Sequence, residues 1–135
     1  MVEPRRIWWA RPRKLCALER PGGGGRSHRP DRRAAEIDYL RERGVRLVVS
    51  VMRTRHNLDA YDAAGLAWRH MPDATIGELV ALLKRELRGR GAVAIHGDRR
   101  TEVPVAACVA LLDADPAATG LDVDVEEVER LLSAR

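Results

Sequence analysis

Apolar residues recur at two different spacings along the chain, and the two spacings alternate. Short, nearly continuous apolar runs predict buried strands, whereas an apolar residue at every third or fourth position predicts a helix. The runs that predict strands are residues 6–10, 14–18, 45–52, 66–71 and 92–96. The segments that predict helices are residues 30–44, 57–65, 75–91 and about 101–112. From residue 30 onward the two kinds of element follow one another in turn.

This alternation predicts an α/β fold. Strands joined through helices form right-handed crossovers, which place the strands parallel in one sheet and cover both of its faces with helices. The first two strands flank Pro12, so we expect short strands or a hairpin near a sheet edge, where proline is tolerated. The strand at 92–96 is expected to be central and parallel to the strand at 46–51. The 135 residues suffice for one domain, so residues 1–135 are predicted to form a single domain with about four to five strands.

Two segments beside the predicted helices are rich in turn-forming residues. Residues 19–30 contain four consecutive glycines between two prolines, which is typical of a flexible linker. The glycines lack the flanking strand, helix and lysine of a nucleotide-binding loop. Asp31 is a candidate N-cap for the following helix, and Gly44 is its expected end.

Composition and charge narrow the function classes. No apolar run reaches the length of a membrane helix, and residues 1–14 lack the apolar core of a secretory signal, so we expect a soluble cytoplasmic protein. Cys16 and Cys108 lack metal-ligand spacing and are expected to be reduced thiols, with no metal and no cofactor bound. The net charge is +4, with a basic start and an acidic end. A basic stretch is most often a solvated face, so we do not expect nucleic-acid binding.

The turn that follows the strand at 92–96 carries the strongest chemical signal. Ligands gather at the carboxyl ends of strands in open α/β sheets, and the free N–H groups of the next helix favour an anion there. Arg99, Arg100 and the Thr101 hydroxyl can donate to phosphate or sulfate oxygens. The residues predicted to form this anion site are His96, Gly97, Asp98, Arg99, Arg100 and Thr101.

The layout of these segments resembles the compact dual-specificity and tyrosine phosphatases over nearly the whole chain. The stretches that carry the resemblance are IWWARPRKL, YLRERGVRLVVSVM, YDAAGLAWRHMPDA and AVAIHG…RRTEVPVAACVALL. In that family the strand ends in His-Cys, five residues follow, and Arg and Ser or Thr begin the helix. The resemblance places His96 on the motif histidine, Arg100 on the arginine that clamps the phosphoryl group, and Thr101 on the hydroxyl residue. Asp73 matches the aspartate that protonates the leaving group.

The turn departs from the family pattern at two points. Gly97 stands where the family has its nucleophilic cysteine. Only Asp98 and Arg99 separate Gly97 from Arg100, so the loop is three residues short and offers fewer backbone N–H groups to a phosphate. Cysteinyl-phosphate chemistry is therefore not expected.

Three interpretations remain open at the level of sequence, and enzyme activity is not decided among them. The first is an inactive pseudophosphatase that binds a phosphorylated ligand or a protein partner. The second is a phosphohydrolase in which Asp98 attacks phosphorus or Asp73 activates water, while Arg100 stabilises the phosphoryl charge. The third is an α/β domain in which Asp98 pairs with Arg99 or Arg100 and caps the helix.

Overall fold

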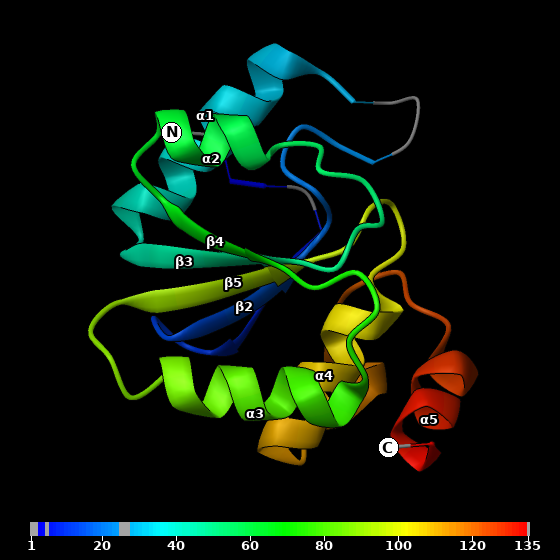
Figure 1. Cartoon of the computed structure of the whole chain (residues 1–135). Coiled ribbons are helices and arrows are strands. Elements are labelled where there is room, and N and C mark those ends of the chain that lie inside the picture. Colours follow the sequence, from blue (N-terminus) through cyan, green and yellow to red (C-terminus); the bar gives the residue numbers. More distant parts are fainter. Residues whose placement is uncertain (1–2, 5, 25–27, 135) are drawn as a thin grey trace.

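A five-stranded sheet forms the centre of the computed structural model, which describes residues 3–4, 6–24 and 28–134. Its position between two layers of helices can be followed in Figure 1. Its order is β1-β2-β5-β3-β4. The edge strand β1 is antiparallel to β2, and all other neighbours are parallel. The strands are β1 Ile7–Arg11, β2 Leu15–Leu18, β3 Val45–Ser50, β4 Ala67–His70 and β5 Ala92–His96. The chain is therefore α/β, with an N-terminal hairpin at one sheet edge and the predicted central strand, β5, beside β3.

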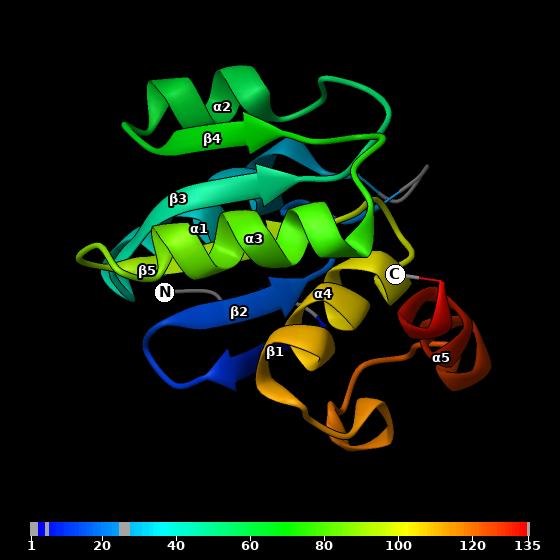
Figure 2. The ribbon, with the colours of Figure 1, turned by 60° about the horizontal axis from the view of Figure 1, so that its bottom comes forward.

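Helices cover both faces of the sheet. Helices α1 and α2 pack on one face, and α3, α4 and α5 lie on the other (Figure 1). The α-helices are α1 Pro30–Glu42, α2 Leu58–Ala63, α3 Ile76–Glu86, α4 Glu102–Leu112 and α5 Val125–Ser133. A short 3-10 helix, Pro116–Ala118, joins α4 to α5. The apolar pattern did not lead us to predict α5, which packs against α4 near the carboxyl ends of the parallel strands (Figure 2).

The central position of β5 in the sheet explains why its sequence is almost continuously apolar. All five residues of β5 are buried, because the strand lies between β2 and β3 and both of its faces are covered by helices. His96 is the last residue of β5 and pairs in register with Leu18 of β2 and Ser50 of β3. The carboxyl ends of these parallel strands therefore meet at one edge of the sheet.

Two local expectations were wrong. Helix α1 begins two residues earlier than Asp31 as N-cap would require: its N-cap is Arg29, which makes no side-chain capping bond, and Asp31 lies in the first turn. Residues 21–24 of the glycine-rich segment are buried, so this part of the predicted linker is packed against the domain, while residues 25–27 lie outside the described residues. Across the described residues, none of the helices is long and apolar enough to span a membrane.

Candidate functional site

Four loops meet at the carboxyl edge of the sheet. Because β2, β3, β4 and β5 run parallel, the residues that follow each of them emerge on the same side (Figure 2). Backbone hydrogen bonds join these loops in pairs: Val51 N–H donates to the His96 carbonyl at 3.0 Å, and Arg20 N–H donates to the Asp98 carbonyl at 3.2 Å. The predicted turn, residues 97–101, is thus fixed to the loops after β2 and β3.

His96 supports this turn from below as a neutral, fully buried side chain. Its Nδ1–H donates to the Gly97 carbonyl at 2.8 Å, so Nε2 accepts from the Tyr61 hydroxyl at 2.7 Å. Burial lowers the pKa of His96 to about 4. Asn57 extends the network, because its amide donates to the Tyr61 hydroxyl and to the Pro21 carbonyl. His96 therefore shapes the turn, and its nitrogens are engaged in this network.

Gly97 begins a turn that leaves no room for a side chain. A Cβ built at this position would lie 2.6 Å from the Arg100 carbonyl oxygen, which is closer than real Cβ atoms approach. Any larger residue would require the backbone of the turn to move. The short spacing between Gly97 and Arg100 that the sequence revealed thus has a physical counterpart in a tightly closed loop.

The start of α4 is occupied by a carboxylate of the protein itself. Glu102 has a side chain only 7% exposed, and its carboxylate accepts from the Thr101 N–H at 3.2 Å and from the Arg100 guanidinium. Arg100 is otherwise largely exposed. Thr101 is buried and makes no side-chain capping bond. At this helix start, Glu102 takes donors that the sequence analysis assigned to an external anion.

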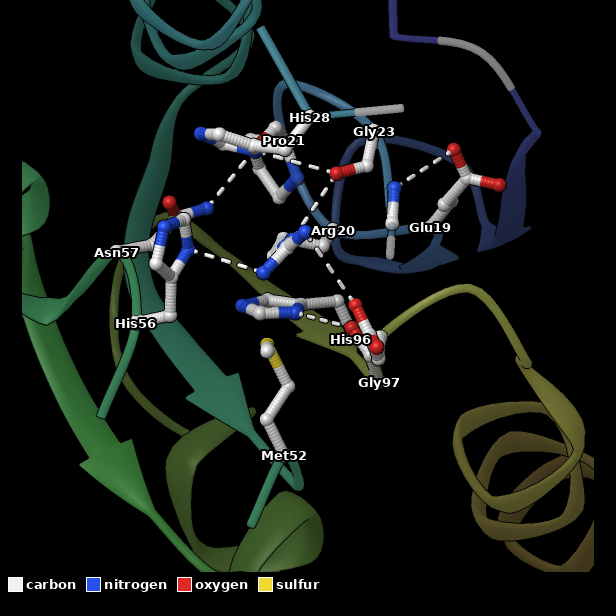
Figure 3. Close-up of polar contacts among 12 residues, drawn as sticks. Glu19, Arg20, Pro21, Gly23, His28, Met52, His56, Asn57, His96 and Gly97 are labelled. Atoms are coloured by element: carbon white, nitrogen blue, oxygen red, sulfur yellow. Dashed lines mark hydrogen bonds and ion pairs between the residues drawn. The ribbon is translucent and has the colours of Figure 1, made fainter. Parts of the chain in front are cut away.

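Asp98 connects the turn to Arg20, a buried arginine in the loop after β2. Its carboxylate lies 3.5 Å from Nη2 of Arg20, whose side chain is 7% exposed. Arg20 also donates from Nε to the Gly23 carbonyl and from Nη1 to Nδ1 of His56, each at 3.0 Å (Figure 3). The ion pair found for Asp98 is thus with Arg20, whereas the third interpretation had expected Arg99 or Arg100.

The glycine-rich segment packs directly on the predicted turn. A Cβ at Gly24 would lie 2.5 Å from the Arg99 backbone, so only glycine allows the two loops to approach this closely. Gly22, whose φ is +93°, donates its N–H to the buried Glu36 carboxylate at 2.7 Å. The N–H of Gly24 donates to Glu19. These contacts hold residues 22–24 in place as part of the site.

Two histidines lie beside Arg20. The rings of His28 and His56 meet edge to face with centroids 4.5 Å apart (Figure 3). Burial and the positive charge of Arg20 lower the pKa of both side chains. His28 donates from Nδ1 to the Gly23 carbonyl at 3.1 Å, which ties it to the same loop as Arg20. Both rings are therefore neutral near pH 7 and lie beside the charged guanidinium of Arg20.

Two cavities open at this edge and share Met52, Arg53 and Asp98 in their linings. One, of about 620 Å³, lies between the predicted turn and α5 and is also lined by Arg100 and Glu102. The other, of about 750 Å³, lies between Arg20 and the loop after β3. The loop after β3 was not predicted to be part of the site. Its signal in the sequence is the polar run Arg53-Thr54-Arg55-His56, which closely follows a buried strand.

Asp73 is a predicted site residue that does not line either of the cavities beside the turn. It follows β4, is 81% exposed, and lies 3.6 Å from the exposed Arg53 guanidinium. It lines neither of the two cavities. The structure thus brings residues 96–101 together, while Asp73 lies outside the linings of the cavities beside them.

Both cysteines lie away from this edge. Cys16 is in the middle of β2 and Cys108 is inside α4, and both are buried. Burial raises the pKa of Cys108 to about 12 and also raises that of Cys16. Each thiol is thereby kept in its unreactive form. Among the described residues, no group of three or more His, Cys, Asp or Glu side chains could hold a metal ion.

The sheet order, the helices on both faces and the turn after the central strand define a protein with a phosphatase-like fold. No family model and no curated protein matches the sequence. Solved structures do match: Tk-PTP in its active form has a TM-score of 0.61 and 14% identity over 96% of this chain and 95% of its own. TpbA from P. aeruginosa has a TM-score of 0.59 and 15% identity over 90% and 80% of the two chains.

A third solved structure matches to a similar degree. The kinase associated phosphatase, studied with serine in place of its catalytic cysteine, has a TM-score of 0.57 and 16% identity over 90% and 88% of the two chains. At these identities the likeness establishes the fold, which is that of the protein tyrosine and dual-specificity phosphatases. The expectation drawn from the sequence is confirmed at this level.

Proposed function

We propose that this chain is a phosphatase-fold protein that carries out no cysteine-dependent hydrolysis and binds a phosphorylated ligand or a protein partner at the carboxyl edge of its sheet. The closed turn at Gly97 is the observation that supports this proposal. A nucleophile at the end of β5 would need a side chain there, and a Cβ at Gly97 meets the Arg100 carbonyl at 2.6 Å. The two thiols of the chain are buried elsewhere.

A binding role accords with the charges that remain at this edge. Arg20, Arg53, Arg55 and His56 line one cavity together with a single carboxylate, Asp98. Guanidinium groups are suited to phosphate because two N–H donors can engage two oxygens at once. A phosphorylated ligand would therefore find cationic donors at the sheet edge even though the start of α4 already holds the Glu102 carboxylate.

The proposal is tested by assaying hydrolysis of an aryl phosphate and, in parallel, thermal stability in phosphate. We expect no turnover by the unmodified protein, and a higher melting temperature in millimolar phosphate, because a ligand that binds only the folded state stabilises it. Turnover that disappears when both thiols are alkylated would contradict the proposal. So would the absence of any effect of phosphate or of a phosphorylated ligand together with failure to bind a protein partner.

Gly97→Cys is the matched control for the nucleophile. If the chain lacked only a thiol, this variant would gain activity. We expect none, because the introduced Cβ must displace the Arg100 carbonyl and the shortened loop presents too few N–H donors to the phosphoryl oxygens. Circular dichroism of the variant establishes that it is folded before its activity is compared.

Asp98 provides a reason to keep a hydrolytic function as the second candidate. Its half-exposed carboxylate lines both cavities and lies next to a buried arginine, so a nucleophile and a charge-stabilising group are adjacent. This alternative predicts slow turnover that survives thiol alkylation and disappears in Asp98→Asn. No activity in either protein would favour the binding function.

A further inference from the structure

The loop between β3 and α2 faces the larger cavity with two arginines and a histidine. Its residues 53–56 read Arg-Thr-Arg-His and are all exposed. The cavity, of about 750 Å³, also borders the buried Arg20. Among the described residues, three arginines and one histidine thus line this space together with one carboxylate, Asp98.

We propose that this cavity is an oxyanion-binding site in which Arg55 and His56 hold a phosphate or sulfate group, while Arg20 orients His56. The inference rests on the proposed function and deepens it, since it moves the anion from the predicted turn at 97–101 to the neighbouring loop. Both positions lie at the same edge of the sheet, but their hydrogen-bond donors are engaged differently.

His56 is arranged as a hydrogen-bond donor. A guanidinium group has no acceptor, so the contact between Arg20 Nη1 and His56 Nδ1 at 3.0 Å makes Nδ1 the acceptor. The hydrogen of the neutral ring then lies on Nε2. Arg20 therefore fixes the tautomer that leaves Nε2–H to donate to an anion.

The two loop arginines keep donors for a ligand. Arg53 lies 3.6 Å from Asp73, but both side chains are more than 80% exposed, and such surface pairs contribute little. The Arg55 guanidinium lies 5.3 Å from the centroid of the Trp68 ring. Contact with an aromatic face orients a guanidinium group without using the donors in its plane. Arg55 is therefore positioned beside the cavity and can still donate hydrogen bonds.

Charges around His56 add to the attraction for an anion. Partial loss of contact with water comes first among the causes that lower its pKa, followed by the positive charges of Arg20, His28 and Arg33, with Asp98 acting in the opposite direction. A dianion in the cavity would offset these positive charges and favour the protonated ring. Anion binding and protonation of His56 should therefore reinforce each other.

The smaller cavity lacks this excess of positive charge. Its lining contains Arg53 and Arg100 together with four carboxylates: Asp98, Glu102, Asp124 and Glu127. The Glu102 carboxylate already binds Arg100 and the Thr101 N–H. An external anion would have to displace an internal one there, whereas no such displacement is required of Arg55.

The experiment is a calorimetric titration of sulfate and of inorganic phosphate into the purified protein and four variants. Arg55→Gln and His56→Gln test the proposed site, and Arg100→Gln tests the turn. Arg88→Gln removes an exposed cation between α3 and β5, at the opposite edge of the sheet, and controls for net charge. We expect Arg55→Gln and His56→Gln each to weaken anion binding about tenfold, the usual loss with a charge-assisted hydrogen bond, and the other two variants to bind as the unmodified protein does.

The outcomes separate the two proposals. Binding lost in Arg100→Gln and kept in Arg55→Gln and His56→Gln overturns this inference and leaves the proposed function in place. Equal weakening in Arg55→Gln and Arg88→Gln also overturns it, since net charge alone would then explain binding. If the unmodified protein binds neither anion, this inference and the phosphorylated-ligand form of the proposed function both fail, while binding to a protein partner remains measurable by itself.

Two further readouts concern His56 and the source of the anion. Sulfate remains a dianion between pH 5.5 and 8, so tighter sulfate binding at lower pH, lost in His56→Gln, supports participation of this ring; pH-independent binding overturns its role. Phenyl phosphate that binds as tightly as inorganic phosphate, with the same dependence on Arg55, identifies an ester-linked ligand. Binding restricted to the inorganic anions identifies a site for the free ion.

Discussion

The turn after β5 and the loop after β3 lie at the same sheet edge, yet their arginine side chains are engaged differently. In the turn, Glu102 engages Arg100 and the Thr101 N–H from two or fewer residues away. In the loop, residues 53–56 face a cavity with one carboxylate in its lining. The two regions differ in how their carboxylates are placed: Glu102 is buried and bound to Arg100, whereas the Asp73 that lies near Arg53 is largely exposed.

At the start of α4, the donors of Arg100 and of the Thr101 N–H are engaged by a carboxylate of the chain itself. The favourable potential at the N-terminus of α4 acts equally on an internal carboxylate. Glu102 is connected to the helix already, so it binds there without the loss of translational freedom that an external ligand incurs. The loop after β3 has no counterpart to Glu102 in the lining of its cavity, apart from the half-exposed Asp98.

Low pH is expected to cause the largest loss of stability at the turn, because it protonates the buried side chain of His96. The pKa of His96 is about 4 in the folded protein and 6.5 for an ordinary histidine, so the unfolded chain binds more protons between these values. Stability should be highest above pH 6.5 and fall as the pH drops toward 4. A shift of this size corresponds to a loss on the order of 3 kcal/mol.

Denaturant unfolding at several pH values checks this prediction, and nuclear magnetic resonance assigns it. His28 and His56 also have lowered pKa values and act in the same direction, so the resonance of His96 must be followed individually. We expect its ring to stay neutral well below pH 6. Titration of His96 near pH 6.5 would show that the buried network with Tyr61 does not hold it neutral.

Gly97→Ala should be the next largest effect and acts on the turn alone. The added methyl group meets the Arg100 carbonyl, and overpacking of this kind destabilises by about 2 kcal/mol. Gly77→Ala is the control: it lies in α3 with only the Thr75 hydroxyl near the new methyl, at 3.9 Å, so stability should be unchanged or rise. Equal melting temperatures for the two variants would mean that the turn is open enough to accept a side chain.

Much of the fold follows from the sequence because its signals are local. The strand β5 is encoded in a continuous apolar run and the helix α3 in an apolar residue at every third or fourth position, and both, like the start of α4, lie within a few residues of their predicted ranges. The N-cap of α1 was misplaced because Asp31 satisfies the composition rule, whereas the helix begins at Pro30. Proline favours the first helical position, which was the better signal here.

Only part of the site could be predicted from the sequence, because its main contacts join residues that are far apart in the chain. Residues 96–101 were recognised as a unit, since they are adjacent in the chain. The pairing of Asp98 with Arg20 joins loops 78 residues apart, and no local pattern predicts it. The glycines at 22–24 were interpreted as a linker because flexibility is what glycine contributes locally; their use for close approach to Arg99 depends on the folded neighbour.

Tyr61→Phe tests the support that the two regions share. The Tyr61 hydroxyl donates to His96 below the turn and accepts from Asn57, which precedes α2. Removing it leaves Nε2 of His96 buried without its donor, which should destabilise by about 1 kcal/mol. Chemical denaturation measures the change, and anion binding should decrease little. A variant as stable as the unmodified protein would indicate that His96 finds another donor.

Glu102→Gln is predicted to have the smallest effect on stability and to bear most directly on the comparison. Loss of a carboxylate from the first turn of α4 should reduce stability by about 0.5 kcal/mol, since the helix dipole favours a negative charge there. The same change releases Arg100 from its ion pair and removes the negative charge that repels phosphate from the Thr101 N–H. The turn should therefore begin to bind phosphate. Calorimetry should then show added or tighter phosphate binding that disappears in the double variant Glu102→Gln/Arg100→Gln.

Glu42→Gln, at the exposed end of α1, controls for the change in net charge. If Glu102→Gln and Glu42→Gln bind phosphate equally, the internal carboxylate is not what distinguishes the turn from the loop, and the difference must instead come from the closed backbone at Gly97.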